Sequence, residues 1–532
     1  MTRTGTRPTA RDLAAATPAT RDRYVDLLRV ASLAVVVLGH WLMAAVTAGG
    51  SVGNVLAVVP ALQVLTWGLQ VMPVFFFVGG FAHALSYRSR PGYAAFVRGR
   101  VRRLLRPTAL FAVLWGAAAL VVQLLGGGGG LTGTALRLVT QPLWFVGIYL
   151  AMVAFAPPLL RLHRRWGWGA FAVLAGGVAA VDLLRFAGDV PYVAFLNFAL
   201  VWLAVHQLGF LRADGRLRAP WALASAGLAG AVALVALGPY PLSMVGMPGE
   251  EVSNMAPPTL ALLCHGMWLV GAVELLRGPG ARLAARARVW RVVVAANGVA
   301  MTAFLWHLTA MLGVYGAMLA LGVTLPEPAS GAWWAHLPVR VALAAAVTAL
   351  LVGVFRYAER PARAPGAEPV SASRPGSGPV SASRPGPGPV SASRPGPGPV
   401  SASRPGPGPV SASRPGPGPV SASRPGPGPV SASRPGKAPA SASCPGKAAV
   451  PGPRPEADLP VPAAGGSAPG TAVPAALGVA LSLLGVLGLS AVGYGGLLEG
   501  HSAVLVAVPV TAPQALLLIL AGWALVELRR PS

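Results

Sequence analysis

Long uninterrupted apolar segments constrain the fold of this chain more than any other feature. Each is about 20 residues long, the length that an α-helix needs to cross the ~30 Å hydrocarbon layer at 1.5 Å per residue. Of the 532 residues, 54% are hydrophobic and only 11% are charged, which excludes an ordinary soluble enzyme. We therefore expect an all-α, polytopic membrane helix bundle. Its first ten helices are predicted at about 27–46, 64–86, 107–126, 142–162, 168–186, 192–211, 220–239, 256–276, 294–321 and 338–356.

The placement of positive charge predicts how this bundle is oriented. A formal charge of +26 would suggest nucleic acid binding in a soluble protein, but here the arginines occupy the short gaps between apolar segments. Twenty-six of them fall in alternate gaps, whereas only Arg137, Arg185 and Arg340 fall in the others. Positive residues stay in the cytoplasm, so we expect a multi-pass protein of the cell membrane. Its N-terminal segment, residues 1–26, and its C-terminus would both be cytoplasmic, and no nucleic acid partner is expected.

The chain changes character after the tenth apolar segment. Near-identical copies of the decapeptide PVSASRPGPG begin at Pro369, and they contain no large apolar residue that could bury a core. We expect residues 362–470 to be a disordered linker. Residues 471–532 hold two further apolar segments, at about 472–494 and 503–526, which predict a detached pair of transmembrane helices. The two cysteines lie in very different segments, so neither a structural disulfide nor a metal site is indicated.

Two ionisable residues in the first apolar segment are the strongest candidates for chemistry. Arg29 and His40 are eleven residues apart, which is 1100° of helical rotation, or 20° beyond three full turns. Both side chains should therefore project from one face, about 16 Å apart along the axis. Ionisable groups inside a membrane are costly and mark cavities or pathways. The alternatives are that Arg29 extends to the lipid headgroups and that His40 is a structural histidine.

Several segments, taken in order, resemble the acyltransferase 3 family of integral-membrane O-acyltransferases. Arg29 and His40 match the family's motif of Arg, ten residues and His in its opening helix. The resemblance covers about residues 20–361, so residues 27–361 would form a ten-helix acyltransferase domain. The other matching segments are MPVFFFVGGF at 72–81, FVRGRVRRLLRP at 96–107, PLWFVGIYLAMVAFAPPL at 142–159, TAFLWHLTAML at 302–312 and ERP at 359–361. Two departures are Gly79, where the family usually has Ser, and Phe304, in place of a common Tyr.

The resemblance implies transfer of an acyl group from a cytoplasmic donor, with acyl-CoA as co-substrate, to a hydroxyl of a carbohydrate, glycolipid or secondary metabolite. His40 would be the base, Arg29 would position the donor or stabilise charge, and His307 would be a third catalytic candidate. Structural roles for His307 stay equally open. No permanently bound cofactor is implied. Phosphates of the donor could bind an inner loop that carries Arg98, Arg100, Arg102, Arg103 and Arg106, although topology alone also explains that loop. The candidates for donor binding are Arg98, Arg102, Arg103 and Arg106.

Other functions are compatible with the same residues. A ten-helix protein with charges inside the membrane could be a transporter or flippase, and an inactive domain could act as a scaffold. We interpret three further intramembrane polar residues, Asp182, His265 and Glu274, as packing or locally paired groups, with Asp182 close to Arg185. The acyl chain, the acceptor and the oligomeric state are not readable from the sequence.

Overall fold

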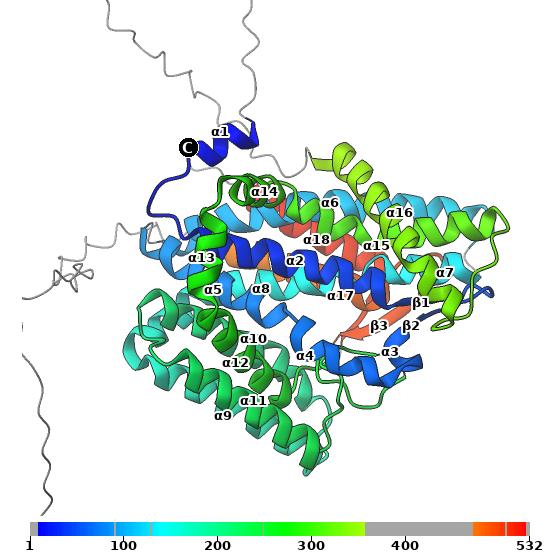
Figure 1. Ribbon diagram of the computed structural model, residues 1–532. Coiled ribbons are helices and arrows are strands. Elements are labelled where there is room, and N and C mark those ends of the chain that lie inside the picture. The colour runs from blue at the N-terminus through cyan, green and yellow to red at the C-terminus, as the bar shows by residue number, and fades with distance from the viewer. Residues whose placement is uncertain are drawn as a thin grey trace, which may run out of the picture. The chain divides into compact units, whose positions relative to one another are not determined.

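A computed structural model describes residues 9–89, 92–127, 130–247, 249–356, 472–505 and 508–527. Ten of the described helices are long and apolar enough to cross a membrane, or eleven if α12 (Leu260–Leu275) and α13 (Arg277–Ala285), which meet at a 58° bend, form one span. This confirms the predicted membrane helix bundle. Each of the ten segments predicted before residue 360 contains a helix. These helices are α2 (Arg23–Met43), α5 (Met72–Ser89), α6 (Tyr93–Leu124), α8 (Pro142–Trp166), α9 (Trp168–Phe186), α10 (Asn197–Ala213), α11 (Pro220–Leu237), α12 (Leu260–Leu275), α15 (Ala300–Ala320) and α16 (Gly331–Phe355) (Figure 1).

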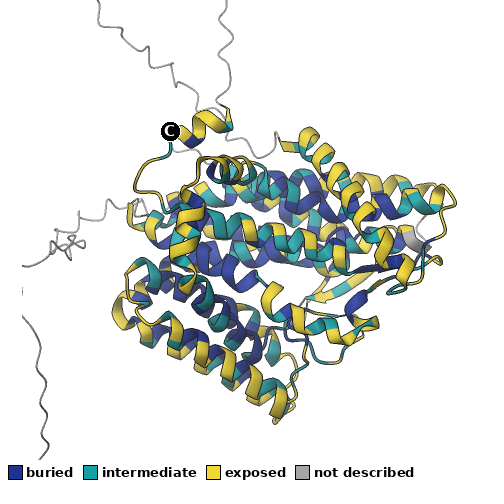
Figure 2. Ribbon diagram, viewed as in Figure 1, coloured by how far each residue is buried: buried dark blue, intermediate teal, exposed yellow. Residues whose placement is uncertain are grey.

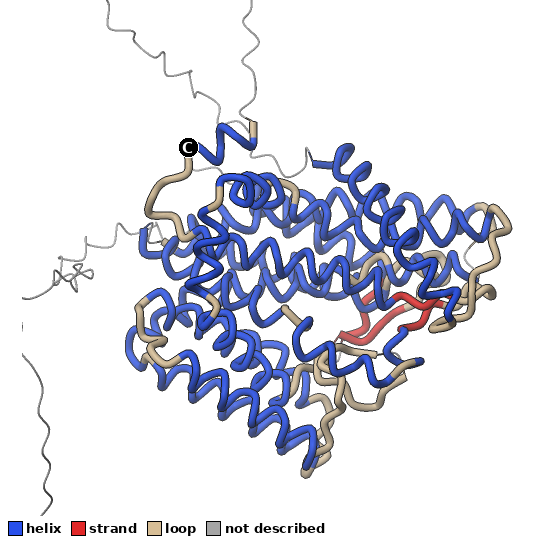
Figure 3. The backbone as a smooth tube through the Cα atoms, viewed as in Figure 1, coloured by secondary structure: helices blue, strands red, loops and turns tan. Residues whose placement is uncertain are grey.

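Shorter elements connect these spans. Two antiparallel hairpins are the only strand pairs among the described residues, and both lie in loops (Figure 3). The first pairs β1 (Ala44–Val46) with β2 (Val52–Asn54), and the second pairs β3 (Ser502–Leu505) with β4 (Val508–Thr511). The remaining helices described before residue 357 are α1 (Ala10–Ala15), α3 (Val55–Val58), the 3₁₀ helix η1 (Pro60–Leu65), α4 (Thr66–Leu69), α7 (Gly130–Leu138), the 3₁₀ helix η2 (Val193–Leu196), α13 (Arg277–Ala285) and α14 (Ala287–Asn297).

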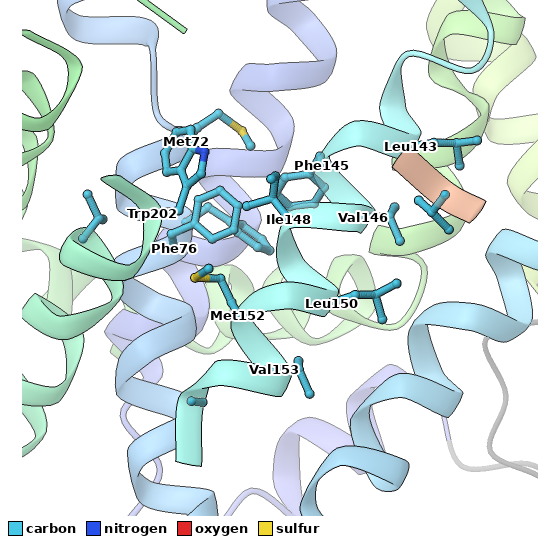
Figure 4. Close-up of a cluster of buried hydrophobic side chains, with 14 of the residues drawn as sticks. Met72, Phe76, Leu143, Phe145, Val146, Ile148, Leu150, Met152, Val153 and Trp202 are labelled. Carbon is cyan, nitrogen blue, oxygen red and sulfur yellow. The ribbon is translucent and has the colours of Figure 1, made fainter. Parts of the chain in front are cut away.

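The surface and the core divide as expected for a bundle in lipid. Figure 2 shows exposed residues along the outer helices. Among them, Leu183 of α9 and Leu350 of α16 are each 66% exposed, as expected for lipid-facing side chains. The core gathers aromatic residues of α5, α8 and α10. Figure 4 shows Phe76, Phe145 and Trp202 from these three helices meeting there, and the Phe76 and Trp202 ring centroids lie 4.7 Å apart.

The arginine-rich stretch at 96–106, expected to be an inner loop, is helical. It forms the first half of α6, which has 32 residues and is therefore about 48 Å long. Arginine and leucine are good helix formers, and Pro107 is accommodated inside the helix. Because this helix is longer than the hydrocarbon layer is thick, its arginine-bearing half extends toward one membrane surface.

The C-terminal helices are not detached. The pair α17 (Ala472–Val492) and α18 (Ala512–Glu527) packs closely together and against α6 and α8, within one compact unit. The second predicted segment divides into the β3–β4 hairpin and α18, whose 16 residues span only about 24 Å. Glycines permit the close approach, since a Cβ on Gly147 of α8 would lie 2.5 Å from Leu487 of α17. The predicted linker at 362–470 lies outside the described residues.

Candidate active site

One face of α2 turns toward the core of the bundle and carries both predicted residues. The helix begins after Asp22, whose carboxylate accepts hydrogen bonds from the backbone amides of the first turn. Leu33 and Val36 pack against the main core, and at 100° per residue they share a face with Arg29 and His40. The residues on the opposite face are exposed, namely Ala31, Ala34, Leu38 and Leu42. Arg29 and His40 therefore project from the face that α2 packs against the bundle.

The structure brings His40 together with His307 of α15. The ring centroids are 5.0 Å apart, and Nδ1 of His40 lies 3.4 Å from Nε2 of His307. His307 is fully buried, whereas His40 is only partly buried. A further contact joins the two helices, because the indole N–H of Trp41 donates to the backbone carbonyl of His307 at 3.1 Å. Two residues 267 positions apart in the chain therefore form one imidazole pair.

The hydrogen bonds of this pair assign its protons. Nδ1 of His307 lies 2.5 Å from the carbonyl oxygen of Phe304, and Nδ1 of His40 lies 2.8 Å from that of Val36. Carbonyl oxygens only accept, so each Nδ1 carries a hydrogen in the neutral ring. The lone pair of His307 Nε2 then faces the Nδ1–H of His40. Among the described residues no hydrogen bond reaches Nε2 of His40, so its lone pair is available to a substrate.

Arg29 of α2 lies within electrostatic range of His83 of α5 and Arg100 of α6. Its guanidinium is 3.4 Å from Asp26, but that carboxylate is held more closely by Arg21, at 2.6 and 3.0 Å. The charge of Arg29 acts electrostatically on Arg100 of α6, and so does that of Arg103. Arg100 donates to the carbonyl of Ala82 at 3.5 Å. Three guanidinium groups therefore gather at this end of the bundle, a suitable arrangement for a multiply charged anion.

The four arginines predicted to bind the donor have different surroundings. Arg103 is exposed and lies within electrostatic range of Arg100. Arg102 forms a bidentate ion pair with Glu527 of α18, at 3.0 and 2.9 Å, so this guanidinium already has a carboxylate partner. Arg98 and Arg106 are partly buried and engaged in interactions of their own. Arg100, which belongs to the same predicted loop but was not among these four candidates, is the residue of α6 on which the charge of Arg29 acts.

A second pair of histidines was missed by the sequence analysis. His83 of α5 and His206 of α10 are buried, with Nδ1 of His83 3.2 Å from Nε2 of His206. The hydroxyl of Tyr149 in α8 lies 3.3 Å from Nε2 of His83. Both histidines stand inside apolar segments, so the rule that selected His40 would also have selected them.

The remaining intramembrane polar groups have structural partners. His265 contacts the carbonyl of Trp67 at 2.9 Å, and Glu274 pairs with Arg212 at 2.9 Å. Asp182 was expected to pair locally with Arg185. The charge of Arg185 does act on it, but its hydrogen bonds come from other segments. Its donors are Asn197, Tyr240 and the backbone amide of Leu260 at the start of α12.

A third polar cluster lies at the end of α10, outside the spans. Asp214 accepts a hydrogen bond from Nε2 of His163 at 2.9 Å and pairs with Arg88. Partial burial of its carboxyl opposes ionisation, but the hydrogen bond from His163 and the charge of Arg88 outweigh that effect and lower the pKa of Asp214. In the described part of the chain no group of three or more His, Cys, Asp or Glu residues is arranged to hold a metal ion.

Comparison with known proteins identifies the family. The family model described as an acyltransferase domain matches residues 22–356, which is more than half of the chain. No curated protein and no solved structure matches this sequence. The matched region contains all ten helices predicted before residue 360, together with Arg29, His40 and His307. The chain is therefore a multi-pass membrane protein that belongs to the acyltransferase 3 family.

Proposed function

We propose that this protein transfers an acyl group from a cytoplasmic acyl-CoA to a hydroxyl of a carbohydrate, glycolipid or secondary metabolite. The observation that carries the proposal is the His40–His307 pair, in which one imidazole nitrogen is left as a free base inside a membrane bundle. An intramembrane histidine with a fixed tautomer is suited to general base catalysis near neutral pH.

The chemistry follows from the proton positions. Nε2 of His40 takes the proton of the acceptor hydroxyl as its oxygen attacks the thioester carbonyl carbon. The tetrahedral intermediate collapses, the carbon–sulfur bond breaks, and the imidazolium of His40 returns the proton to the departing thiolate. While His40 is charged, Val36 and His307 both accept from its Nδ1–H, so the pair orients and stabilises the imidazolium.

The spacing of the arginines and His40 fits a donor with phosphates at one end and a thioester at the other. Arg29 and His40 are about 16 Å apart along α2. The arm of coenzyme A between phosphate and sulfur is a chain of about thirteen bonds, which extends to about 16 Å at the roughly 1.2 Å per bond of an extended chain. Phosphates near Arg29, Arg100 and Arg103 would then place the thioester beside His40. The arginine-bearing end, with both chain termini, would face the cytoplasm.

The test is to follow labelled acyl-CoA with purified full-length protein in proteoliposomes. The protein is expected to release the acyl group to water or to an added hydroxyl acceptor, whereas a transporter or flippase would do neither. Replacing His40 with Gln should lower turnover by about 10²–10⁴-fold, the usual contribution of a general base. His336→Gln, at an exposed position of α16, is the matched control and should keep full turnover. Wild-type protein that leaves acyl-CoA intact would overturn the proposal.

A further inference from the structure

The buried pair of His83 and His206 has no part in the transfer step described above. Together with Tyr149 it joins three helices, α5, α8 and α10, next to the arginine cluster. Gly79 makes room for it, since a Cβ at that position would lie 3.5 Å from the Tyr149 ring and 3.7 Å from that of His206. Gly80 brings α5 against α10, because a Cβ there would collide with the carbonyl oxygen of His206.

The hydrogen bonds fix the direction of this chain of groups. Nδ1 of His206 lies 3.2 Å from the carbonyl oxygen of Phe76, to which it must donate. Its Nε2 therefore accepts from Nδ1–H of His83. Nε2 of His83 then carries a lone pair and accepts from the hydroxyl of Tyr149. The two imidazoles are neutral, and this series of hydrogen bonds ends at the partly exposed phenol of Tyr149.

Positive charge surrounds this phenol and the nearer imidazole. Arg29 of α2 and Arg100 of α6 both oppose a positive charge on His83 while no anion is bound, and Arg100 also acts electrostatically on Tyr149. The guanidinium of Arg100 lies 4.3 Å from the ring centroid of Phe96, and this ring packs edge-on against His83 at 5.5 Å. On the other elements packed around α5, three further ionisable groups have partners of their own. Glu274 of α12 pairs with Arg212 of α10, His265 contacts Trp67, and His163 of α8 contacts Asp214.

We propose that His83, His206 and Tyr149 form a proton-coupled clamp for a phosphate of the donor, an inference that rests on the proposed function. A proton arriving at Nε2 of His83 reverses its hydrogen bond, because this N–H then donates to the oxygen of Tyr149. The phenolic hydrogen stays on its oxygen but no longer bonds to His83. It turns toward a phosphate oxygen held by Arg29 and Arg100. The charge of the bound phosphate offsets that of Arg29 and Arg100, which otherwise opposes protonation of His83. The phosphate gains a hydrogen bond and a nearby cation, and binding takes up one proton from solvent.

The experiment is calorimetric titration of purified full-length protein with coenzyme A, in two buffers of different ionisation enthalpy at the same pH. The difference in apparent binding enthalpy gives the number of protons taken up. Wild-type protein and the control His336→Gln should both take up about one proton per coenzyme A bound. His83→Gln should take up close to none. Tyr149→Phe should keep the uptake but bind at least about tenfold more weakly, through loss of one hydrogen bond to a charged group.

The outcomes separate this inference from the proposed function. Binding of coenzyme A by wild-type protein without proton uptake, or with the same uptake in His83→Gln, overturns the clamp and leaves the transferase proposal intact. No binding at all overturns the donor assignment, and the clamp with it. If His83→Gln does not yield folded protein, Tyr149→Phe decides the matter, because unchanged affinity in that variant contradicts the clamp.

Discussion

The docking of the C-terminal helices onto the acyltransferase domain can be tested at Gly147. A Cβ at this position would lie 2.5 Å from Cδ2 and 2.8 Å from Cγ of Leu487, about 1 Å inside the 3.5–4.0 Å of a normal carbon contact. Gly147→Ala should therefore push α17 away from α8. Overpacking of this kind costs about 1–3 kcal/mol, and the better helix propensity of Ala returns up to about 1 kcal/mol. We expect a net loss of about 1–2 kcal/mol.

The assay is thermal unfolding in detergent, with two matched variants. Gly353 of α16 has no atom within 4 Å of its added Cβ, so Gly353→Ala should leave the midpoint unchanged or raise it. In the Leu487→Ala background the clashing atoms are absent, and Gly147→Ala should then cost nothing further. The reasoning would be refuted if Gly147→Ala matched the wild type in stability, or if its cost were the same with Ala at position 487.

Three further predictions follow from the polar contacts and the linker. The pKa of Asp214 is lowered in the folded state from its ordinary value of 3.8, so its ionisation stabilises the fold above about pH 4 and is lost as the pH falls through the folded pKa. In Asp214→Asn the melting midpoint should therefore fall less steeply than in the wild type as the pH is lowered. An unchanged dependence of the midpoint on pH would contradict this. The Arg102–Glu527 pair is partly exposed and worth at most about 1 kcal/mol, so Glu527→Gln should change the melting midpoint little, whereas a large drop would show that the pair is structural. Deleting residues 369–448 should preserve turnover, because α17 and α18 dock through their own side chains; loss of activity in a folded deletion variant would count against that view.

Hydropathy predicted the spans because the bilayer imposes helix length on the sequence directly. The helical phase of Arg29 and His40 was also predictable, since eleven residues define an angle within one helix. The proximity of His40 and His307 was not, because it depends on how α2 packs against α15. The arginine stretch before Pro107 was expected to be a loop because it is so highly charged, although its residues favour a helix.

Contacts between segments distant in sequence account for the other differences. Nothing in the apolar pattern of residues 472–526 distinguishes a detached pair of helices from a docked one. The close approach depends on single glycines, such as Gly147 opposite Leu487, whose partners are visible only in three dimensions. The same holds for Asp182, whose hydrogen-bond donors lie on segments that the fold brings together. His83 and His206 could have been noticed as intramembrane histidines, but their pairing with each other could not.

In the proposed mechanism His40 performs the chemistry while Arg29, about 16 Å away on the same helix face, holds the charged end of the donor. The most direct measurement compares turnover and coenzyme A affinity in two single variants, His40→Gln and Arg29→Gln, each confirmed as folded. We predict that His40→Gln lowers kcat by about 10²–10⁴-fold at unchanged affinity, and that Arg29→Gln mainly weakens binding. Unchanged turnover in His40→Gln, or lost affinity in that variant with kcat intact, would contradict the account.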